Sequence, residues 1–519
     1  MPVRITEQRK QTMKTYKVTI KPQNLIVEAP EGETLLAVQI HAGLTPDAPC
    51  GGQGTCGKCL VDVLEGDAFR TVTACQYPVD RDLVIRPHEK KTFHILESGI
   101  RRELGTLDPQ ISEGYGAAFD IGTTSVVCYL LDLADGHMAA RASMLNPQSQ
   151  FGADVISRCE YAMEKGVEVL SSTIRKALNE LIEQVCRSAG IKKEQIRLLT
   201  VVGNTCMHHL FMNIDPRPLT VVPYEAVMKE EVTMKASDAD LHVHPDALLQ
   251  VLPNIAGFVG ADTVGCLLAT EFDTLDEISL MIDIGTNGEM VMGNRKRMIA
   301  CSTAAGPAFE GAKIECGMRG TEGAVDHVRL EDDRLVCHVL GDLDEDKAAG
   351  ICGSGLMDAV AAALDAQIID ESGKIDEDCE QVFRLEGSGM LAIRLTEHVY
   401  LSQKDIREVQ LAKGAVAAGI ELLAEKLGIG IGDVKRIMIA GAFGNYMDPH
   451  SACRIGMIPS TLEERIEMIG NAAGEGSIIA TLNYQEFLRA EKIRKKAEFL
   501  ELASSPDFQD TFVDNLLFE

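Results

Sequence analysis

Hydrophobic and polar residues alternate along four short segments near the start of the chain. These segments, residues 16–20, 24–29, 60–64 and 82–86, are separated by polar or glycine-containing stretches, which is typical of half-buried strands. Between the second and third segments, residues 33–42 are expected to form a helix. The pattern therefore predicts a small sheet with one helix at the start of the chain.

Further along, the chain contains the same β-hairpin pattern twice. Apolar residues lead into Asp-Ile-Gly-Thr at Asp120 and again at Asp283, and each tetrapeptide lies where the hairpin turns. A second and a third strand are expected after each turn, over 125–133 and 138–144 in the first copy and over 288–293 and 297–303 in the second. A duplicated unit with such a long separation indicates two similar lobes.

Helical periodicity supports both lobes. Apolar residues recur on one helical face over 170–185 and over 406–423. Ser402 and Asp405 have the spacing of a capping box at the start of the second helix. Residues 489–498, rich in lysine and glutamate, are expected to form a solvated helix.

The repeated tetrapeptide has a chemistry that suits a magnesium polyphosphate. A carboxylate at a strand end, here Asp120 or Asp283, can hold Mg²⁺ directly or through water. The glycine lets backbone N–H groups approach phosphate oxygens, and the hydroxyls add donors. The alternative is that both acids are ordinary turn residues. The residues expected to contact the phosphates are Gly122, Thr123, Thr124, Gly285, Thr286 and Asn287.

Three further glycine-containing turns complete this pattern. An apolar strand at 436–440 runs into Gly441 and Gly444, where a nucleoside could lie against backbone, although these glycines could also simply end the strand. Two strand-to-helix turns contain Gly203 with Asn204, and Gly353 with Ser354. Together the motifs over residues 113–490 resemble the acetate kinase, sugar kinase, Hsp70 and actin (ASKHA) superfamily.

This resemblance implies a multi-domain α/β chain with two ATPase lobes. We expect the first lobe over residues 113–280 and the second over 281–519, with a C-terminal helix and tail. Glu310, in the motif at 305–311, could orient the water that attacks the phosphate, or it could equally cap a helix.

Four cysteines near the start of the chain have the spacing of iron–sulfur ligands. Cys50, Cys56, Cys59 and Cys75 follow a C-x5-C-x2-C…C pattern, whose first gap is one residue longer than in plant-type [2Fe–2S] ferredoxins. The loop between them is rich in glycine, which lets it wrap a cluster closely. Zinc is the alternative, but zinc usually takes two C-x2-C pairs or a Cys/His mixture. With the predicted strand order, this indicates a β-grasp [2Fe–2S] ferredoxin domain over residues 14–90.

Composition limits the partners and the compartment. The chain has 519 residues and a net charge of −28, which disfavours nucleic acids and anionic membranes. No apolar stretch is long enough to span a bilayer, and residues 1–13 form a polar tail without a signal core. The remaining cysteines are scattered singly among apolar residues, as in reduced cytoplasmic proteins. Residues 91–112 are expected to be a linker with a helical stretch at 95–104.

A ferredoxin joined to such an ATPase resembles the reductive activators of corrinoid proteins. Six further stretches carry this resemblance: 151–158, 203–205, 305–311, 316–318, 405–407 and 411–413. It implies an ATP-hydrolysing enzyme that passes one electron from a [2Fe–2S] cluster to Co(II), giving Co(I) for methyl transfer. It also implies Mg²⁺, a corrinoid protein partner, an external low-potential electron donor and a possible homodimer. Members of this family can carry an extra domain where this chain has only residues 91–112.

Three other functions remain open at this point. The chain could activate another low-potential enzyme, such as a radical-forming dehydratase, although activators of that class hold a [4Fe–4S] cluster between subunits. It could be a metabolite kinase with an attached ferredoxin, which would need a general base beside a substrate hydroxyl. It could also be a redox partner whose ATPase-like part only assembles.

Overall fold

The structure is a computed structural model of the chain. It describes residues 14–519 except for residues 23, 45, 47, 49–51, 53, 55–58, 67, 89–98, 286, 312, 442–445 and 503–504. The chain divides into two compact units, which are described separately below. The first contains residues 1–91 with 149–153, and the second contains residues 92–148 with 154–519.

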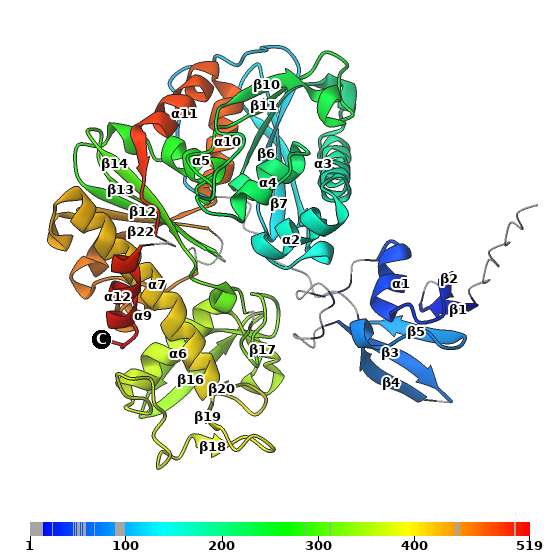
Figure 1. Ribbon diagram of the computed structural model, residues 1–519, viewed down its shortest axis with the longest axis vertical. Coiled ribbons are helices and arrows are strands. Elements are labelled where there is room, and N and C mark those ends of the chain that lie inside the picture. The colour runs from blue at the N-terminus through cyan, green and yellow to red at the C-terminus, as the bar shows by residue number, and fades with distance from the viewer. Residues whose placement is uncertain are drawn as a thin grey trace, which may run out of the picture. The chain divides into compact units, whose positions relative to one another are not determined.

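The first unit is a five-stranded sheet with one helix packed on it (Figure 1). The strand order is β2-β1-β5-β3-β4, and β1 and β5 run parallel. The elements are β1 (Thr15–Ile20), β2 (Leu25–Pro30), α1 (Leu35–His41), β3 (Leu60–Glu65), β4 (Ala68–Thr73) and β5 (Leu83–Pro87). Thr34 caps α1 at its N-terminus. Leu35 and Val38 of this helix pack with Val18, Val61 and Ile85 in the hydrophobic core of the unit. The mixed sheet and single helix match the expected β-grasp arrangement.

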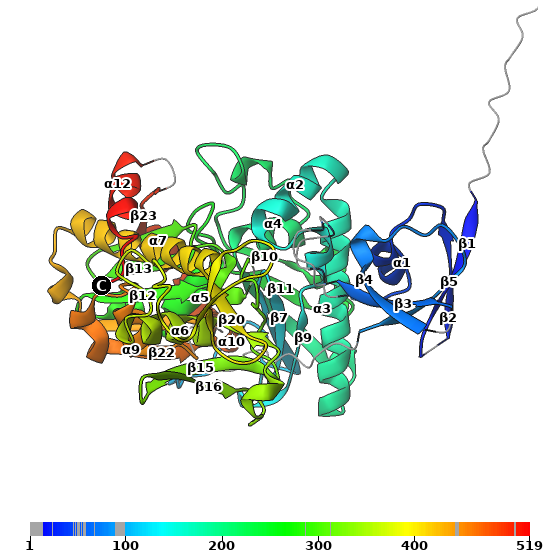
Figure 2. The same cartoon turned by 90° about the horizontal axis from the view of Figure 1, so that it is seen from below.

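The first sheet of the second unit contains the first of the two expected hairpins. Its order is β10-β11-β9-β6-β7-β8. The strands are β6 (Tyr115–Ile121), β7 (Ser125–Asp132), β8 (Met138–Leu145), β9 (Ile196–Gly203), β10 (Val232–Lys235) and β11 (Leu248–Val251). Helices α2 (Val155–Lys165), α3 (Glu168–Ala189), α4 (Thr205–Phe211) and α5 (Ala261–Ala269) belong to the same part of the chain. Helix α3 packs on β7 and β8, and α5 lies on the other side of the sheet (Figures 1 and 2).

The second sheet repeats this arrangement around the second hairpin. Its order is β22-β21-β12-β13-β14-β23. The strands are β12 (Ser279–Ile284), β13 (Gly288–Gly293), β14 (Met298–Thr303), β21 (Arg436–Ala440), β22 (Ile466–Gly470) and β23 (Ala497–Phe499). In both sheets a parallel strand, β9 or β21, lies beside the first strand of an antiparallel meander. Helix α7 (Gln403–Leu427) packs on β13 and β14, and its Ser402–Asp405 capping box is present.

Two small sheets are inserted between β14 and α7. They contain β15 (Ala324–Glu331), β16 (Arg334–Val339) and β17 (Gly350–Ile351), then β18 (Val382–Arg384), β19 (Leu391–Arg394) and β20 (Tyr400–Ser402). Helix α6 (Gly353–Asp365) packs on β15, and helices α9 (Pro449–Arg454) and α12 (Pro506–Asp514) complete the second lobe. Apart from the turn at Gly353, these strands were not predicted from the sequence.

The last part of the chain returns to the first sheet. Helix α10 (Ala472–Leu482) packs on α5, β6 and β9, and α11 (Tyr484–Lys496) packs on α5 and α10. The expected boundary between 113–280 and 281–519 stays a prediction, and these two helices belong to the first lobe by their packing. The helix expected at 489–498 is present up to Lys496, and its Lys492 and Lys495 are exposed as predicted. The prediction is wrong for residues 497–498, which belong to β23, and for Arg489 and Arg494, whose side chains are largely covered in ion pairs with Asp273 and Glu491.

Residues 99–112 lie against these returning helices. Gly99 pairs with Gly470 at the end of β22, and Asp108 pairs with Asn483 between α10 and α11. The guanidinium of Arg102 makes two parallel bonds of 2.8 and 3.1 Å to the Glu486 carboxylate. The helix expected at 95–104 is wrong over 99–104, which contains none, and 95–98 lie outside the described residues. We call residues 99–112 the strap.

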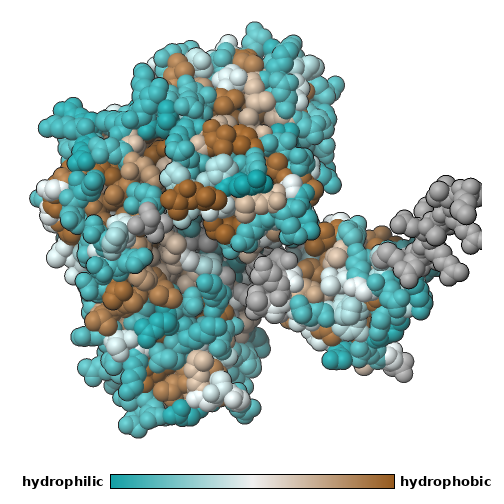
Figure 3. All heavy atoms as spheres, in the orientation of Figure 1, coloured by the Kyte–Doolittle hydropathy of each residue, from teal (hydrophilic) through white to brown (hydrophobic). Residues whose placement is uncertain are grey.

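The face of the molecule seen in Figure 3 is mostly hydrophilic. On the face seen in Figure 3, hydrophobic side chains form several separate patches among hydrophilic ones. Within the described ranges, no helix combines the length and the apolar character needed to cross a bilayer.

His208 lies on α4 in the apolar interior of the first lobe. The side chain is fully buried, and neither ring nitrogen has a hydrogen-bond partner among the described residues. Burial, with a smaller contribution from the neighbouring His209, lowers the pKa of His208 to about 3. The folded protein therefore keeps this imidazole neutral in mild acid, whereas the unfolded chain protonates it.

Replacing His208 with leucine is expected to reduce the loss of stability in acid. The wild type should lose roughly 1–1.5 kcal/mol of unfolding free energy through this group between pH 7.5 and 5.5, because the unfolded histidine binds a proton below about pH 6.5. Urea denaturation at both pH values measures the difference. The exposed His137→Leu is the control, and parallel losses in wild type and His208→Leu would contradict the assignment.

Candidate functional site

Two of the four predicted cluster ligands lie within the described residues. Cys59 directly precedes β3, and Cys75 lies in the short helix η1 (Ala74–Gln76) that follows β4. The antiparallel pairing of β3 with β4 brings them together, so that the Cys75 backbone N–H donates to Cys59 Sγ at 3.4 Å. Gln76 donates to Cys75 Sγ at 3.6 Å. Cys50 and Cys56 lie outside the described residues.

The surroundings of these two sulfurs fit an iron–sulfur cluster. Both side chains are buried, and both sulfurs accept N–H hydrogen bonds of the kind that tunes cluster potentials. Gly54 has φ +77°, and a Cβ there would lie 2.4 Å from the Gln76 amide nitrogen. The positive φ favours glycine here, and the absent side chain lets the loop pass close to the amide that donates to Cys75.

Three side chains hold the first phosphate loop through hydrogen bonds, and two of them, Asn146 and Arg158, are buried. Asn146 donates to the Gly122 carbonyl at 2.8 Å, and Asn204 donates to Thr123 Oγ1 at 2.8 Å. Arg158, which has no exposed surface, donates through Nη2 to the Thr123 carbonyl at 2.7 Å. Loop 122–124 is thus fixed before any ligand arrives, which favours tight binding of a rigid polyphosphate.

Gly203 and Asn204 were expected to bind the cofactor. In the structure, their contacts position β9 and the first phosphate loop. A Cβ on Gly203 would lie 2.6 Å from the Ile121 carbonyl, so glycine allows β9 to approach β6 here. Asn204 caps α4 and holds Thr123. Sequence reasoning missed Asn146 and Arg158, because their role depends on segments far from the loop.

Four acidic side chains gather at the ends of the two hairpins. Burial raises the pKa of Asp120 and of Asp283 to about 6, although an Asn471 amide at 2.9 Å partly offsets this for Asp120. Burial and the charge of Asp283 raise the pKa of Asp262 to about 7. Burial and the charges of Asp262 and Asp283 raise the pKa of Glu289 well above its usual value.

This cluster is a poor environment for negative charge unless a cation joins it. Oxygen donors gathered in this way suit Mg²⁺, which keeps several waters and phosphate oxygens. The sequence predicted Asp120 and Asp283 but missed Asp262, at the start of α5, and Glu289, on β13. The available signal for Glu289 was an acid in an otherwise apolar strand.

The second phosphate loop is partly described. The Gly285 N–H donates to the Asn287 carbonyl at 2.9 Å, and Thr286 lies outside the described residues. Gly441 follows β21 with φ +90°, and a Cβ there would lie 2.6 Å from Asp283 Oδ1. The third predicted element therefore meets the carboxylate of the second loop at a position where glycine is required. Gly444 lies outside the described residues.

Glu310 connects the two lobes. It is the last residue of the short helix η7 (Pro307–Glu310), and its Oε2 accepts a 3.3 Å hydrogen bond from Thr124 Oγ1 of the first loop. A Cβ on Gly285 of the second loop would lie 3.7 Å from Glu310 Oε1. Glu310 thus lies beside both phosphate loops. Helix α6, which begins with Gly353 and Ser354, packs against η7, and Ser354 contacts Cys352 at 3.4 Å.

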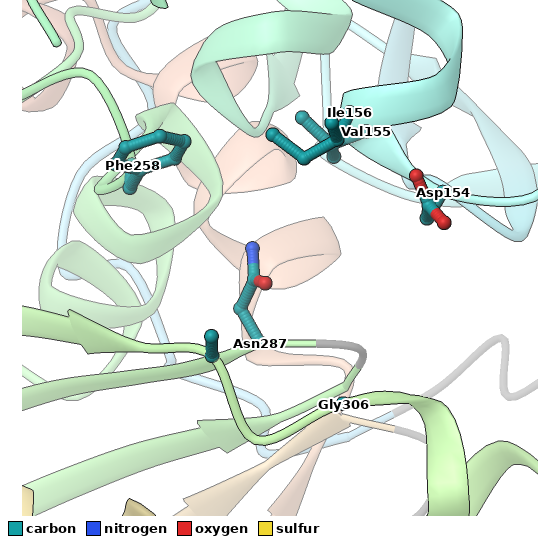
Figure 4. Close-up of a pocket in the computed structure, with 7 residues that line it drawn as sticks. Asp154, Val155, Ile156, Phe258, Asn287 and Gly306 are labelled. Carbon is teal, nitrogen blue, oxygen red and sulfur yellow. The ribbon is translucent and has the colours of Figure 1, made fainter. Parts of the chain in front are cut away.

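A cavity of about 190 Å³ opens beside these loops (Figure 4). Asp154, Val155 and Ile156 at the start of α2 line it on one side. Phe258 from the first lobe and Asn287, Ala304 and Gly306 from the second lobe complete its wall. Asn287, a predicted phosphate contact, thus reaches an open space next to the second loop.

Comparison with known proteins identifies the family of each part of the chain. Residues 18–82 match the family described as the 2Fe-2S iron-sulfur cluster binding domain. Residues 115–275 match the RACo middle region, and residues 277–519 match the C-terminal domain of RACo, the ASKHA domain. The corrinoid activation enzyme RamQ of Eubacterium limosum is 34% identical, and the alignment covers 92% of this chain and 94% of RamQ. The chain belongs to the RACo family.

Two further proteins are similar to this chain over much of their length. The [Co(II) methylated amine-specific corrinoid protein] reductase of Methanosarcina barkeri is 27% identical, with 78% of this chain and 77% of that protein covered. The solved structure of a reductive activator for corrinoid, iron-sulfur protein superposes with a TM-score of 0.70 and 30% identity, covering 97% of this chain and 98% of that one. The predicted fold, a ferredoxin domain followed by an ASKHA ATPase, is confirmed.

Glu310→Gln is expected to slow ATP turnover while leaving ATP affinity nearly unchanged. The amide keeps the Thr124 contact but cannot accept a proton from an attacking water, so the rate should fall by roughly 10²-fold or more. Steady-state phosphate release and nucleotide titration measure the two quantities. Glu315→Gln, on the same segment, is the control, and an equal loss of affinity in Glu310→Gln would assign Glu310 to binding.

Proposed function

We propose that this RACo-family chain is an ATP-dependent reductive activator of a corrinoid protein. It passes one electron from a [2Fe–2S] cluster, held by Cys50, Cys56, Cys59 and Cys75, to Co(II) and so gives Co(I). The observation that carries this proposal is the 34% identity to a corrinoid activation enzyme over nearly the whole chain, in a molecule that retains both a paired cysteine site and a clustered carboxylate site.

Energetics explain why an electron carrier is joined to an ATPase. Plant-type [2Fe–2S] centres lie near −400 mV, and each ~59 mV of mismatch in a one-electron step reduces the equilibrium constant about tenfold. A Co(II)/Co(I) couple in a corrinoid is more demanding than this. ATP can offset the gap only if it binds one conformation of the activator or its complex better than another.

The carboxylate cluster supplies the residues for a magnesium nucleotide. Asp120 and Asp283, with Asp262 and Glu289 close by, would hold Mg²⁺, which neutralises phosphate charge when it is bound. Loop 122–124 and Asn287 would supply backbone N–H groups, hydroxyls and a side-chain amide to the phosphates. Gly441 keeps the space beside Asp283 free of a side chain.

The remaining side chains position these groups. Arg158 and Asn204 fix Thr123 from behind, so that its hydroxyl and its neighbours keep one orientation. Glu310 Oε2 holds the Thr124 hydroxyl and is placed to accept a proton from a water between the loops. Since Thr124 and Glu310 belong to different lobes, their contact depends on the angle between the lobes. The external electron donor, a cytoplasmic location and a homodimer stay predictions from the resemblance.

Cobalt reduction with and without ATP tests the proposal. The cluster-loaded protein, a chemical low-potential donor and a Co(II) corrinoid protein from the same cell are mixed anaerobically, and Co(I) is followed by its visible spectrum. We expect Co(I) to accumulate with magnesium ATP and to remain low without it. Equal yields would remove the coupling role of ATP, and no Co(I) under either condition would reject the activity.

A further inference from the structure

We propose that the second lobe carries another metal site, separate from the magnesium nucleotide site. Its ligands are the Nε2 atoms of His327 on β15 and His338 on β16, and its ion is a divalent transition metal of the zinc type. The site lies on the small sheet that packs on α6 (Figure 1).

A β-bulge in β15 brings the side chains of this site together. His327 and His338 lie directly opposite each other on the antiparallel pair, and the register shifts between Val325 and His327. Asp326 and His327 therefore share the position opposite His338, and in a bulge of this kind both side chains lean to the same face. The two imidazole rings are 6.4 Å apart between centroids. Bulges are common beside functional sites because they redirect a side chain.

Each imidazole is oriented by a carboxylate at its other nitrogen. His327 Nδ1 lies 2.8 Å from Asp358 Oδ2, and His338 Nδ1 lies 2.6 Å from Asp326 Oδ1. A neutral imidazole that donates from Nδ1 presents a lone pair at Nε2. This carboxylate–histidine arrangement is the one that holds histidine ligands of metals in place.

Burying the Asp358 carboxylate costs free energy, and orienting a metal-binding histidine would account for that cost. It lies on α6 with 4% of its surface exposed, and its Oδ1 has no hydrogen-bond partner among the described residues. A buried carboxylate that uses one oxygen on a histidine and leaves the other unpaired needs compensation. A cation at His327 Nε2 would supply positive charge to the pair.

The remaining coordination comes from nearby carboxylates or water. His338 Nε2 lies 3.7 Å from Asp342 Oδ1, and His327 Nε2 lies 3.9 Å from Asp326 Oδ2. Within the described part of the chain, no three such side chains already surround one point. The site is therefore a two-histidine site that is completed by water or by a small movement of Asp342, whose side chain is fully exposed. Imidazole ligands favour Zn²⁺, Ni²⁺, Cu²⁺ or Co²⁺ over Mg²⁺.

Zinc binding to the full-length, cluster-loaded protein tests this site. Zn²⁺ is titrated in competition with a chromophoric chelator, with millimolar Mg²⁺ present to occupy the carboxylate cluster. We expect the wild type to bind one equivalent more than His327→Ala/His338→Ala. Asp358→Asn should weaken this equivalent roughly 10–100-fold, because the orienting carboxylate is lost. Equal zinc stoichiometry in the wild type and the double variant would overturn the site.

Two controls keep the test decisive. The matched variant His242→Ala/His244→Ala removes two histidines of the first lobe, the exposed His242, which lies 3.1 Å from Asp240, and the half-buried His244, and should bind as much zinc as the wild type. If the double variant does not fold, zinc-soaked crystals of the wild type replace it. Anomalous scattering should then place zinc beside both Nε2 atoms, and its absence there would reject the proposal. Neither readout depends on ATP or on cobalt reduction, so failure here leaves the proposed activity untouched.

Discussion

Replacement of Cys59 by serine is expected to remove the iron–sulfur cluster and to reduce Co(I) formation to background. Cys59 is buried beside Cys75 and accepts its backbone N–H, so the loss of this thiolate leaves the cluster without a ligand on its protein-packed side. ATP binding should persist, because the carboxylate cluster belongs to the other compact unit. Visible absorbance and EPR of the dithionite-reduced protein measure the cluster, and the cobalt spectrum measures the activity.

Cys379→Ser is the matched control for this experiment. Cys379 is a partly exposed thiol in the second unit, and its removal should leave cluster absorbance, EPR and cobalt reduction unchanged. Nucleotide titration of Cys59→Ser shows whether the ATPase part is still folded. A Cys59→Ser protein with a full cluster signal would show that Cys59 is not a ligand. Loss of the signal in both variants would point to general instability.

Asp283→Asn is expected to have opposite effects on stability and on activity. Without Mg²⁺, the variant should be more stable than the wild type by roughly 1–2 kcal/mol, after allowance for solvent screening, since it removes a buried negative charge beside Asp262. ATP turnover should fall by roughly 10²–10³-fold, because a ligand that stabilises charge on the phosphates is lost. Thermal unfolding in EDTA and phosphate release with Mg²⁺ measure the two effects.

The sign of the stability change separates a functional carboxylate from an ordinary turn residue. Asp135→Asn, in the exposed turn between β7 and β8, should leave ATP turnover unchanged and should not stabilise the protein, because Asp135 accepts a local hydrogen bond from the His137 N–H. If Asp283→Asn also lowered the melting temperature in EDTA, the carboxylate would be a structural hydrogen-bond acceptor. Normal ATP turnover in the variant would exclude it from the nucleotide site.

Local patterns in the sequence were sufficient for the two hairpins and their turns. Asp120 and Asp283 end apolar strands and precede glycine, so their place could be read from a few adjacent residues, and the structure has both at strand ends. The capping box at Ser402 is equally local and is present. By contrast, β4 was missed, since its residues are mostly exposed and show no alternation between apolar and polar positions.

Residues whose role depends on tertiary contacts could not be predicted from the adjacent sequence. Asp262 and Glu289 carry raised pKa values because the fold buries them and places them near other acids, and nothing adjacent to either residue records that. Arg158 lies in a helix whose role is set by its contact with Thr123. The Lys/Glu composition of residues 489–498 predicted solvent exposure. Arg489 is instead paired with Asp273, which is distant in sequence, and Arg494 is paired with Glu491 on the same helix, so both arginine side chains are largely covered.

Residues of the strap form hydrogen bonds on both sides of helix α10. Gly99 pairs with Gly470, just before α10, and the Arg102 guanidinium donates two hydrogen bonds to the Glu486 carboxylate, in the helix that follows α10. The backbone N–H of Arg102 donates to Glu475, within α10, at 3.0 Å. Helix α10 packs on the first sheet and follows directly from β22 of the second. The strap therefore cannot shift independently of α10, and a rotation of this helix relative to either sheet would displace residues 99–102 with it.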